Sequence, residues 1–173
     1  ESLTNGINGM IFVCDEIPNE TLFDENVIVD LSRVGSSETK SLIMGMLVLK
    51  LQEYRMTSNV MNAELGHITV LEEAHNLLRK TSMEQSSETA NLQGKSVEML
   101  TNAIAEMRTY GEGFIIADQA PGLLDPAVIR NTNTKIVLRT PEANDREAVG
   151  RSMGLTPNQV NEIAKLPSGV GVV

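Results

Sequence analysis

Residues 67–78, HITVLEEAHNLL, form the stretch that decides the fold. A short and mainly apolar run, ITVL, ends in two adjacent carboxylates, Glu72 and Glu73, and a helical pattern begins directly after them. An apolar run of this length is typical of a strand that is buried on both faces of a parallel sheet. Its carboxyl end would lie at the rim where open α/β sheets bind ligands. The alternative is that either acid only caps the next helix, since acids favour helix N-termini.

Further apolar runs predict the rest of a sheet. They lie at 10–14, 26–31, 114–117, 134–139 and, as an edge strand, at 169–173. Helical patterns lie between them, at 38–56, from about 95 to 110, at 125–131, at 144–153 and after 156. This alternation predicts an α/β fold with a mainly parallel sheet. Polar residues follow the strands in DLS, EEAH, DQAP and RTP, which favours a single ligand-binding rim and a nucleotide site over routine helix capping.

The composition is ordinary for one globular domain spanning residues 1–173, with 41% hydrophobic and 21% charged residues. No apolar run approaches the roughly 20 residues that cross a bilayer, and no signal peptide opens the chain. We therefore expect no membrane insertion in this segment. The single cysteine, Cys14, favours a reducing compartment, so the expected location is cytoplasmic. The net charge of −9 argues against a surface that coats nucleic acid throughout, but it leaves room for a local basic loop.

A glycine-rich phosphate loop is missing from the expected pattern. The sequence GK[ST] occurs at Gly94-Lys95-Ser96, but GxxxxGK[ST] needs glycine at position 89, where threonine stands. The surrounding segment 79–95 is polar and Ser/Thr-rich, and we predict a mobile insertion there. If this is a P-loop fold, we expect its first strand and loop to lie upstream of Glu1. The chain alone would then be inactive and bind ATP weakly or not at all.

Four segments, in this order, resemble the HerA-like branch of the HerA/FtsK superfamily of P-loop ATPases over residues 26–173. They are NVIVDLSRVGSSETKSLIMGMLVLKLQEYR, HITVLEEAHNLL, EMRTYGEGFIIADQAP and NTNTKIVLRTPEANDREAVGRSMGL. The resemblance implies a RecA-like three-layer core that lacks its first strand and Walker A loop. It also implies a hexameric ring with ATP and Mg²⁺ between neighbouring subunits. The implied activity is ATP-driven translocation or unwinding of DNA, with a nuclease as a further partner.

Within that resemblance, HITVLEE matches the Walker B strand. Glu72 is then implied to hold Mg²⁺ and Glu73 to polarise the attacking water. Gln119, at the end of the neighbouring strand, is implied to sense the γ-phosphate. His75 either orients Glu73 or is a structural histidine. For Asp30 we expect a role in capping its own loop rather than in the site.

The resemblance also assigns three cations to the nucleotide. Arg108, in EMRTYG, matches an arginine that contacts nucleotide, and its alternative is an ion pair with Glu112. Lys135 and Arg139, in TKIVLR, match charges that reach phosphate or the next subunit, although Arg139 could equally be an exposed strand end. Such cations matter because an arginine that stabilises the transition state contributes ~10³–10⁵ in rate.

Other functions stay open at this point. One is a nucleotide-dependent assembly or regulatory subunit with little hydrolysis, and another is a secretion or conjugation ATPase with a different cargo. EEAH also suggests a DEAH-type helicase, but DQAP stands where that group has Ser-Ala-Thr. For a DNA motor, we expect the 79–95 segment to face the pore of the ring and contact DNA through Arg79, Lys80 or Lys95.

Overall fold

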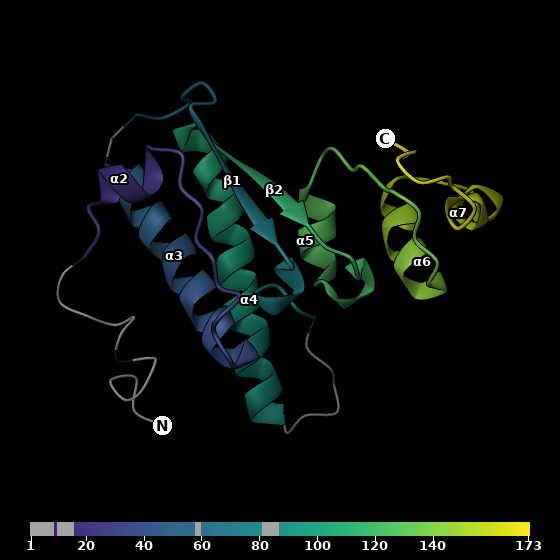
Figure 1. The fold of residues 1–173 in the computed structure, drawn as a ribbon, viewed down its shortest axis with the longest axis horizontal. Helices are drawn as coiled ribbons and strands as arrows, with labels where there is room; N and C mark the ends of the chain where they lie inside the picture. Colours follow the sequence, from purple (N-terminus) through teal and green to yellow (C-terminus); the bar gives the residue numbers. More distant parts are fainter. Residues whose placement is uncertain (1–8, 10–15, 58–59, 81–86) are drawn as a thin grey trace.

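The computed structural model describes residue 9 and residues 16–57, 60–80 and 87–173. Two strands and a series of helices make up this part of the chain (Figure 1). In order they are α2 (Asn19–Phe23), α3 (Ser37–Thr57), β1 (His67–Glu72), η1 (Ala74–Asn76), α4 (Ser87–Met107), η2 (Arg108–Tyr110), β2 (Glu112–Ala117), η3 (Pro121–Leu123), α5 (Pro126–Asn131), α6 (Ala143–Ser152) and α7 (Pro157–Ile163). The predicted strand at 10–14 lies outside the described residues.

Strands β1 and β2 lie side by side in parallel. Their register runs from His67 opposite Glu112 to Glu72 opposite Ala117. Parallel neighbours need a long crossover between them, and α4 lies within that connection. The predicted α/β class with a parallel sheet is therefore confirmed.

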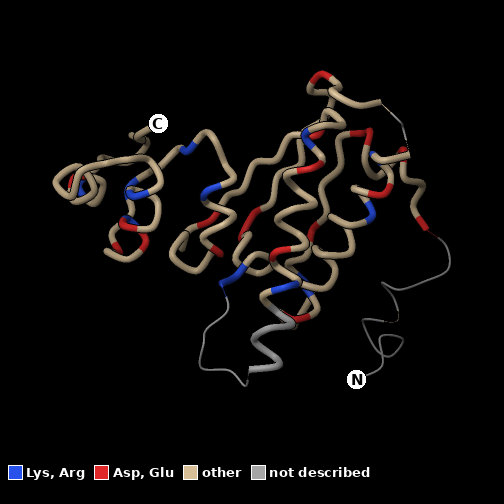
Figure 2. The backbone as a smooth tube through the Cα atoms, turned by 180° about the vertical axis from the view of Figure 1, so that it is seen from behind, with Lys and Arg blue, Asp and Glu red and all other residues tan. Residues whose placement is uncertain are grey.

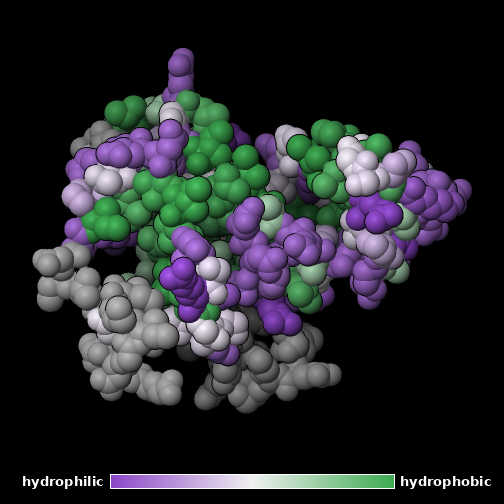
Figure 3. All heavy atoms as spheres, in the orientation of Figure 1, coloured by the Kyte–Doolittle hydropathy of each residue, from purple (hydrophilic) through white to green (hydrophobic). Residues whose placement is uncertain are grey.

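The two faces of this sheet differ in how they are covered. Leu71 is buried in the core cluster, and Phe114 packs against that cluster, together with residues of α3 and α4. On the other face, Ile68, Val70 and Ile115 remain 48%, 54% and 52% exposed. A hydrophobic surface is accordingly visible over the sheet in Figure 3. Among the described residues, α3 and α4 thus cover one face, and the three-layer RecA-like arrangement stays a prediction.

The predicted strand at 26–31 is wrong. These residues have no regular secondary structure, and Ile28 is 93% exposed. Asp30 instead forms a local turn, in which its Oδ1 accepts a hydrogen bond of 2.8 Å from the Ser32 N–H. An apolar run forms a strand only where a neighbour offers a backbone ladder and where a second layer covers its side chains. In the described structure Ile28 has no such cover. The capping role expected for Asp30 is confirmed.

The predicted strands at 134–139 and 169–173 are also wrong. They shrink to one antiparallel bridge, in which Val137 and Val172 exchange two backbone hydrogen bonds of 2.9 Å. Neither segment pairs with β2, so among the described residues neither has a ladder partner in the sheet. Asp145 of α6 accepts a 2.7 Å hydrogen bond from the Gly122 N–H, and α6 packs on η3 and α7. The last segment therefore forms its own small unit of helices.

Helix ends are predicted more accurately because their signals are local. The Ser36 hydroxyl caps α3, and Asp125 caps α5. Thr156 and Gln159 form a capping box at the start of α7, where the helical pattern after 156 begins. Gly111 ends η2 with a φ of 81°, a left-handed conformation that glycine adopts without a steric penalty.

Helix α4 begins at Ser87, earlier than the predicted start near Lys95. The second half of the predicted insertion is therefore helical, whereas residues 81–86 lie outside the described residues. Gly94, Lys95 and Ser96 lie within α4 and cannot form a phosphate loop. None of the described helices combines the length and apolarity needed to cross a membrane.

Candidate functional site

The candidate site lies where β1 and β2 end together. Glu72 is opposite Ala117, so that Glu73 and Asp118 are the next residues on the two strands. Gln119 follows directly, and its side chain is exposed, as are those of Glu72 and Glu73. The structure therefore gathers three of the six predicted site residues at one edge of one sheet, as parallel strands require. Their chemical roles stay predictions.

Glu73 has an unusual backbone. Its φ of 50° and ψ of 45° place it in the left-handed region, which is uncommon for any residue other than glycine, asparagine and aspartate. Holding such a conformation costs on the order of 1–3 kcal/mol, and such residues gather at functional sites. Glu73 precedes η1, but its side chain makes no capping hydrogen bond. Glu73 therefore does not cap η1 through a side-chain hydrogen bond, and its side chain is 54% exposed at the rim.

Asp118 was not predicted as a site residue, yet it organises this edge. Its side chain is only 3% exposed. It accepts hydrogen bonds from the His75 N–H at 2.7 Å, from His75 Nδ1 at 2.9 Å and from the Ala120 N–H at 2.7 Å. The sequence signal was its position, since an acid ends β2 as Glu72 and Glu73 end β1. Asp118 therefore joins the end of β2 to the turn after β1.

His75 stands between the two acids. Its Nδ1 faces Asp118, and its Nε2 lies 3.8 Å from Oε2 of Glu73. The ring is mostly buried, at 22% side-chain exposure. The series Asp118–His75–Glu73 thus connects a buried carboxylate to an exposed one through an imidazole. Both alternatives for His75, a structural role and a role in orienting Glu73, are compatible with this geometry.

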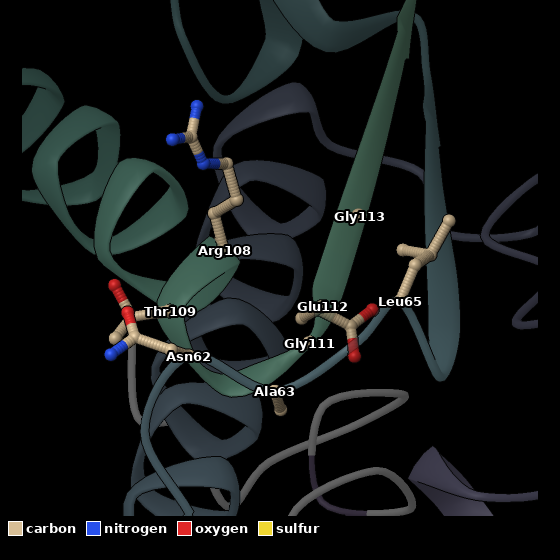
Figure 4. Close-up of a pocket in the computed structure, with 8 residues that line it drawn as sticks. All are labelled: Asn62, Ala63, Leu65, Arg108, Thr109, Gly111, Glu112 and Gly113. Atoms are coloured by element: carbon tan, nitrogen blue, oxygen red, sulfur yellow. The ribbon is translucent and has the colours of Figure 1, made fainter.

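Arg108 lies at the opposite edge of the sheet. It begins η2, just before β2, and the six residues of β2 separate the two edges by roughly 17 Å. Arg108 and Glu112 line a cavity of about 480 Å³, but their side chains point in different directions (Figure 4). The alternative that Arg108 pairs with Glu112 is wrong, because Glu112 pairs with Arg55. Within one chain, Arg108 is not brought to Glu73.

Lys135 and Arg139 are not on the sheet either. Lys135 Nζ donates a 2.6 Å hydrogen bond to the carbonyl of Thr132, just after α5. Arg139 is exposed in the segment between α5 and α6. Because residues 134–139 do not form a strand of the β1–β2 sheet, the sheet does not place Lys135 or Arg139 beside Glu72 and Glu73. Their phosphate contacts stay predictions.

At the amino-terminal edge of the sheet, where Arg108 lies, the side chain of Glu112 is completely buried. Arg55 Nε donates to it at 2.9 Å, His67 Nδ1 lies at 2.8 Å, and the Thr69 hydroxyl donates at 2.6 Å. Arg55 also donates to Asp24 at 2.5 Å. That hydrogen bond, with a second from the Tyr54 hydroxyl, holds the pKa of Asp24 below its ordinary value. His67 is therefore part of a structural network. No short-range sequence pattern reveals partners that lie so far apart in the chain.

A magnesium site would have to use few protein ligands. The described residues contain no group of three or more His, Cys, Asp or Glu side chains that could hold a metal ion. Mg²⁺ commonly binds through one or two carboxylates, with waters and substrate phosphates completing its shell. The exposed carboxylate of Glu72, at the rim of the sheet, fits that donor chemistry.

Comparison with known proteins gives a distant similarity. No protein-family model matches the chain. The chain is 25% identical over 166 residues to "Probable helicase MJECL08" of Methanocaldococcus jannaschii, and the match covers 90% of the chain. It covers 30% of that protein, so the chain spans less than a third of the relative's length. The finding links the chain to a helicase-named protein at low identity.

Proposed function

We propose that this chain is part of an ATP-hydrolysing motor of the DNA translocase or helicase type, similar to the HerA-like ATPases. The observation that carries the proposal is the left-handed backbone of Glu73 at the end of β1, next to the end of β2. A strained, exposed acid at this rim suits a catalytic group better than a structural one. The similarity to a helicase-named protein supports the same theme.

In the proposed reaction, Glu73 orients the attacking water and accepts its proton. The water oxygen bonds to the γ-phosphorus, and the bond from that phosphorus to the bridging oxygen of ADP breaks. Glu72 would hold Mg²⁺, which when bound neutralises charge on the β- and γ-phosphates. Gln119 lies on the adjacent strand end, where its amide could contact the γ-phosphate. The proposal requires a phosphate-binding loop that the described residues do not supply.

The proposal also requires a neighbouring subunit. Arg108 and Glu73 lie at opposite edges of the same sheet, so Arg108 would act on nucleotide held by an adjacent copy. A ring, with ATP between subunits, satisfies this geometry, and a hexamer is the proposed form. DNA is the proposed cargo and the cytoplasm the proposed location. Lys and Arg are spread along the described backbone among Asp and Glu, without a single basic stripe (Figure 2). DNA contact would therefore be local, as expected for a pore loop.

The test is the substitution Glu73→Gln in the protein that carries this sequence together with a phosphate loop. Glutamine keeps the size of the side chain but cannot accept the proton. We expect ATP affinity to stay within about threefold and turnover to fall by at least about 100-fold, the contribution typical of a general base. ATP binding is measured by equilibrium titration, and turnover by phosphate release with and without DNA.

The matched control is Glu162→Gln, since Glu162 is an exposed acid whose one ion pair among the described residues is with Lys165 of the same turn. Its turnover should equal that of the wild type. If Glu73→Gln retained full turnover, the hydrolytic role would be rejected in favour of a nucleotide-dependent assembly or regulatory subunit. Turnover that does not respond to DNA would instead direct attention to a protein cargo.

A further inference from the structure

The buried carboxylate of Asp118 is hydrogen-bonded by His75 and by the turn that follows β2. Two backbone N–H groups, of His75 and Ala120, and one ring nitrogen of His75 surround it. A carboxylate accepts hydrogen bonds and does not donate them, so the proton between the two side chains sits on Nδ1 of His75. Asp118 thus fixes both the orientation of the ring and its tautomer.

The consequence falls on the other ring nitrogen. With its proton on Nδ1, the neutral imidazole presents Nε2 as an acceptor. This atom lies 3.8 Å from Oε2 of Glu73, which is too far for a direct hydrogen bond. Two acceptors at this spacing can be bridged by one water molecule that donates one hydrogen to each. The backbone of Glu73, held in the left-handed region, fixes the direction from which its side chain approaches.

We propose that His75, held by Asp118, is a positioning residue for Glu73, and that the pair presents a water molecule between Nε2 and the Glu73 carboxylate. The inference rests on the proposed function, in which Glu73 accepts the proton of the attacking water. His75 takes no proton in this scheme. It restricts the orientations that the water molecule and the half-exposed Glu73 carboxylate would otherwise sample. Because the water is then already oriented, the barrier to its attack is lower.

Two substitutions at His75 separate this role from a structural one. His75→Asn keeps a side-chain N–H near the position of Nδ1, and so retains a donor for Asp118, but it has no acceptor near Glu73. His75→Gln places its amide near the position of Nε2. We expect His75→Asn to lower kcat by up to about 100-fold, the effect of a misplacement of about 1 Å, with KM for ATP within about threefold. We expect His75→Gln to restore most of the lost kcat.

The matched control is His67→Asn, because His67 belongs to the Glu112 network at the other edge of the sheet. It should lower the temperature of thermal unfolding and leave kcat unchanged. His75→Asn should lower kcat and leave the temperature of thermal unfolding nearly unchanged. A fall in the unfolding temperature of His75→Asn as large as that of His67→Asn, with unchanged kcat, would assign His75 to structure and overturn the proposal.

A double-variant cycle with Glu73→Gln completes the test. If His75 acts through Glu73, adding His75→Asn to Glu73→Gln should cause less than a twofold further loss of kcat. Independent, multiplying losses would overturn the positioning role. The cycle also distinguishes two failures. Full turnover of Glu73→Gln would reject the proposed function itself, whereas an inactive Glu73→Gln beside a fully active His75→Asn would reject only the role of His75.

Discussion

One glutamate at each edge of the β1–β2 sheet, Glu112 and Glu73, shows how differently the fold can surround an acid. At the amino-terminal edge, Glu112 is buried, and Arg55, His67 and Thr69 saturate its carboxylate. At the carboxyl-terminal edge, Glu73 is half exposed and has a strained backbone. Among the described residues, the nearest cationic or imidazole nitrogen to its carboxylate is Nε2 of His75, at 3.8 Å. The described hydrogen bonds of the Glu112 carboxylate are all made to side chains of the same fold. The Glu73 carboxylate keeps hydrogen-bonding capacity for a ligand.

The comparison separates stability from chemistry within one small sheet. A buried acid whose two oxygens are both hydrogen-bonded by neighbouring side chains can hold elements together, but it is not accessible to a substrate. Glu112 joins α3, β1 and β2 in this way, and Arg55 extends the network to Asp24 after α2. Substitutions at the amino-terminal edge should therefore change the free energy of unfolding, whereas those at the carboxyl-terminal edge should change turnover. Arg108 is the exception that tests this division.

The largest expected effect is that of Arg108→Ala. Arg108 lies at the amino-terminal edge, yet no hydrogen bond or ion pair involves its guanidinium in the part of the chain that the structure describes. In the proposed ring it serves an adjacent subunit, so turnover should fall by about 10³-fold while the free energy of unfolding stays within about 0.5 kcal/mol. Phosphate release and urea unfolding measure the two quantities.

Mixing subunits makes this prediction sharper. Arg108→Ala and Glu73→Gln chains, each inactive alone, should regain part of the turnover when they assemble together, because some interfaces then combine an intact Arg108 with an intact Glu73. Arg151→Ala is the control, since Arg151 is exposed and, in the part of the chain that the structure describes, forms an ion pair with Glu147 alone. No regain in mixed assemblies would show that Arg108 does not act across a subunit interface.

The second effect is that of Glu112→Gln on stability. Glutamine removes the buried charge that Arg55 faces and leaves that guanidinium with the half-exposed Asp24 as an ion-pair partner, so we expect a loss of up to about 3–5 kcal/mol, the range for breaking a buried ion pair. The loss is read from urea denaturation. Glu147→Gln, which removes an exposed pair with Arg151, should cost less than about 0.5 kcal/mol. Equal losses for the two variants would contradict the assignment of Glu112 as the centre of a stabilising network.

The sequence predicted the carboxyl-terminal edge well because its signals are local. An apolar run that stops at Glu72 and Glu73, and a second that stops before Gln119, suffice to place these residues at one rim of a parallel sheet. The bounds of α3 and α6 and the start of α7 were predicted to within a residue or two for the same reason. These features depend on residues within a few positions of one another.

Long-range pairing could not be predicted in the same way. Arg55 meets Glu112, and His75 meets Asp118, only after the chain has folded. The runs at 26–31 and 134–139 have the composition of strands, but composition does not supply a ladder partner or a covering layer. The backbone strain at Glu73 is equally hidden, since a glutamate gives no sequence signal of left-handed geometry.

The smallest expected effect is the acid dependence that Asp24 contributes at the amino-terminal edge. Hydrogen bonds from Arg55 and Tyr54 hold the pKa of Asp24 below its ordinary value of 3.8. A depressed folded-state pKa adds stability above the unfolded-state pKa, and this contribution is lost as the pH falls through the folded-state value. Asp24→Asn should therefore lower the free energy of unfolding at pH 6 and have a smaller effect below about pH 3. Because the Asp24 side chain is 46% exposed, solvent screens the pair, and the change at pH 6 should stay below about 1 kcal/mol. Urea unfolding at the two pH values measures the difference, and a loss that is equally large at both would mean that Asp24 acts through packing rather than through its charge.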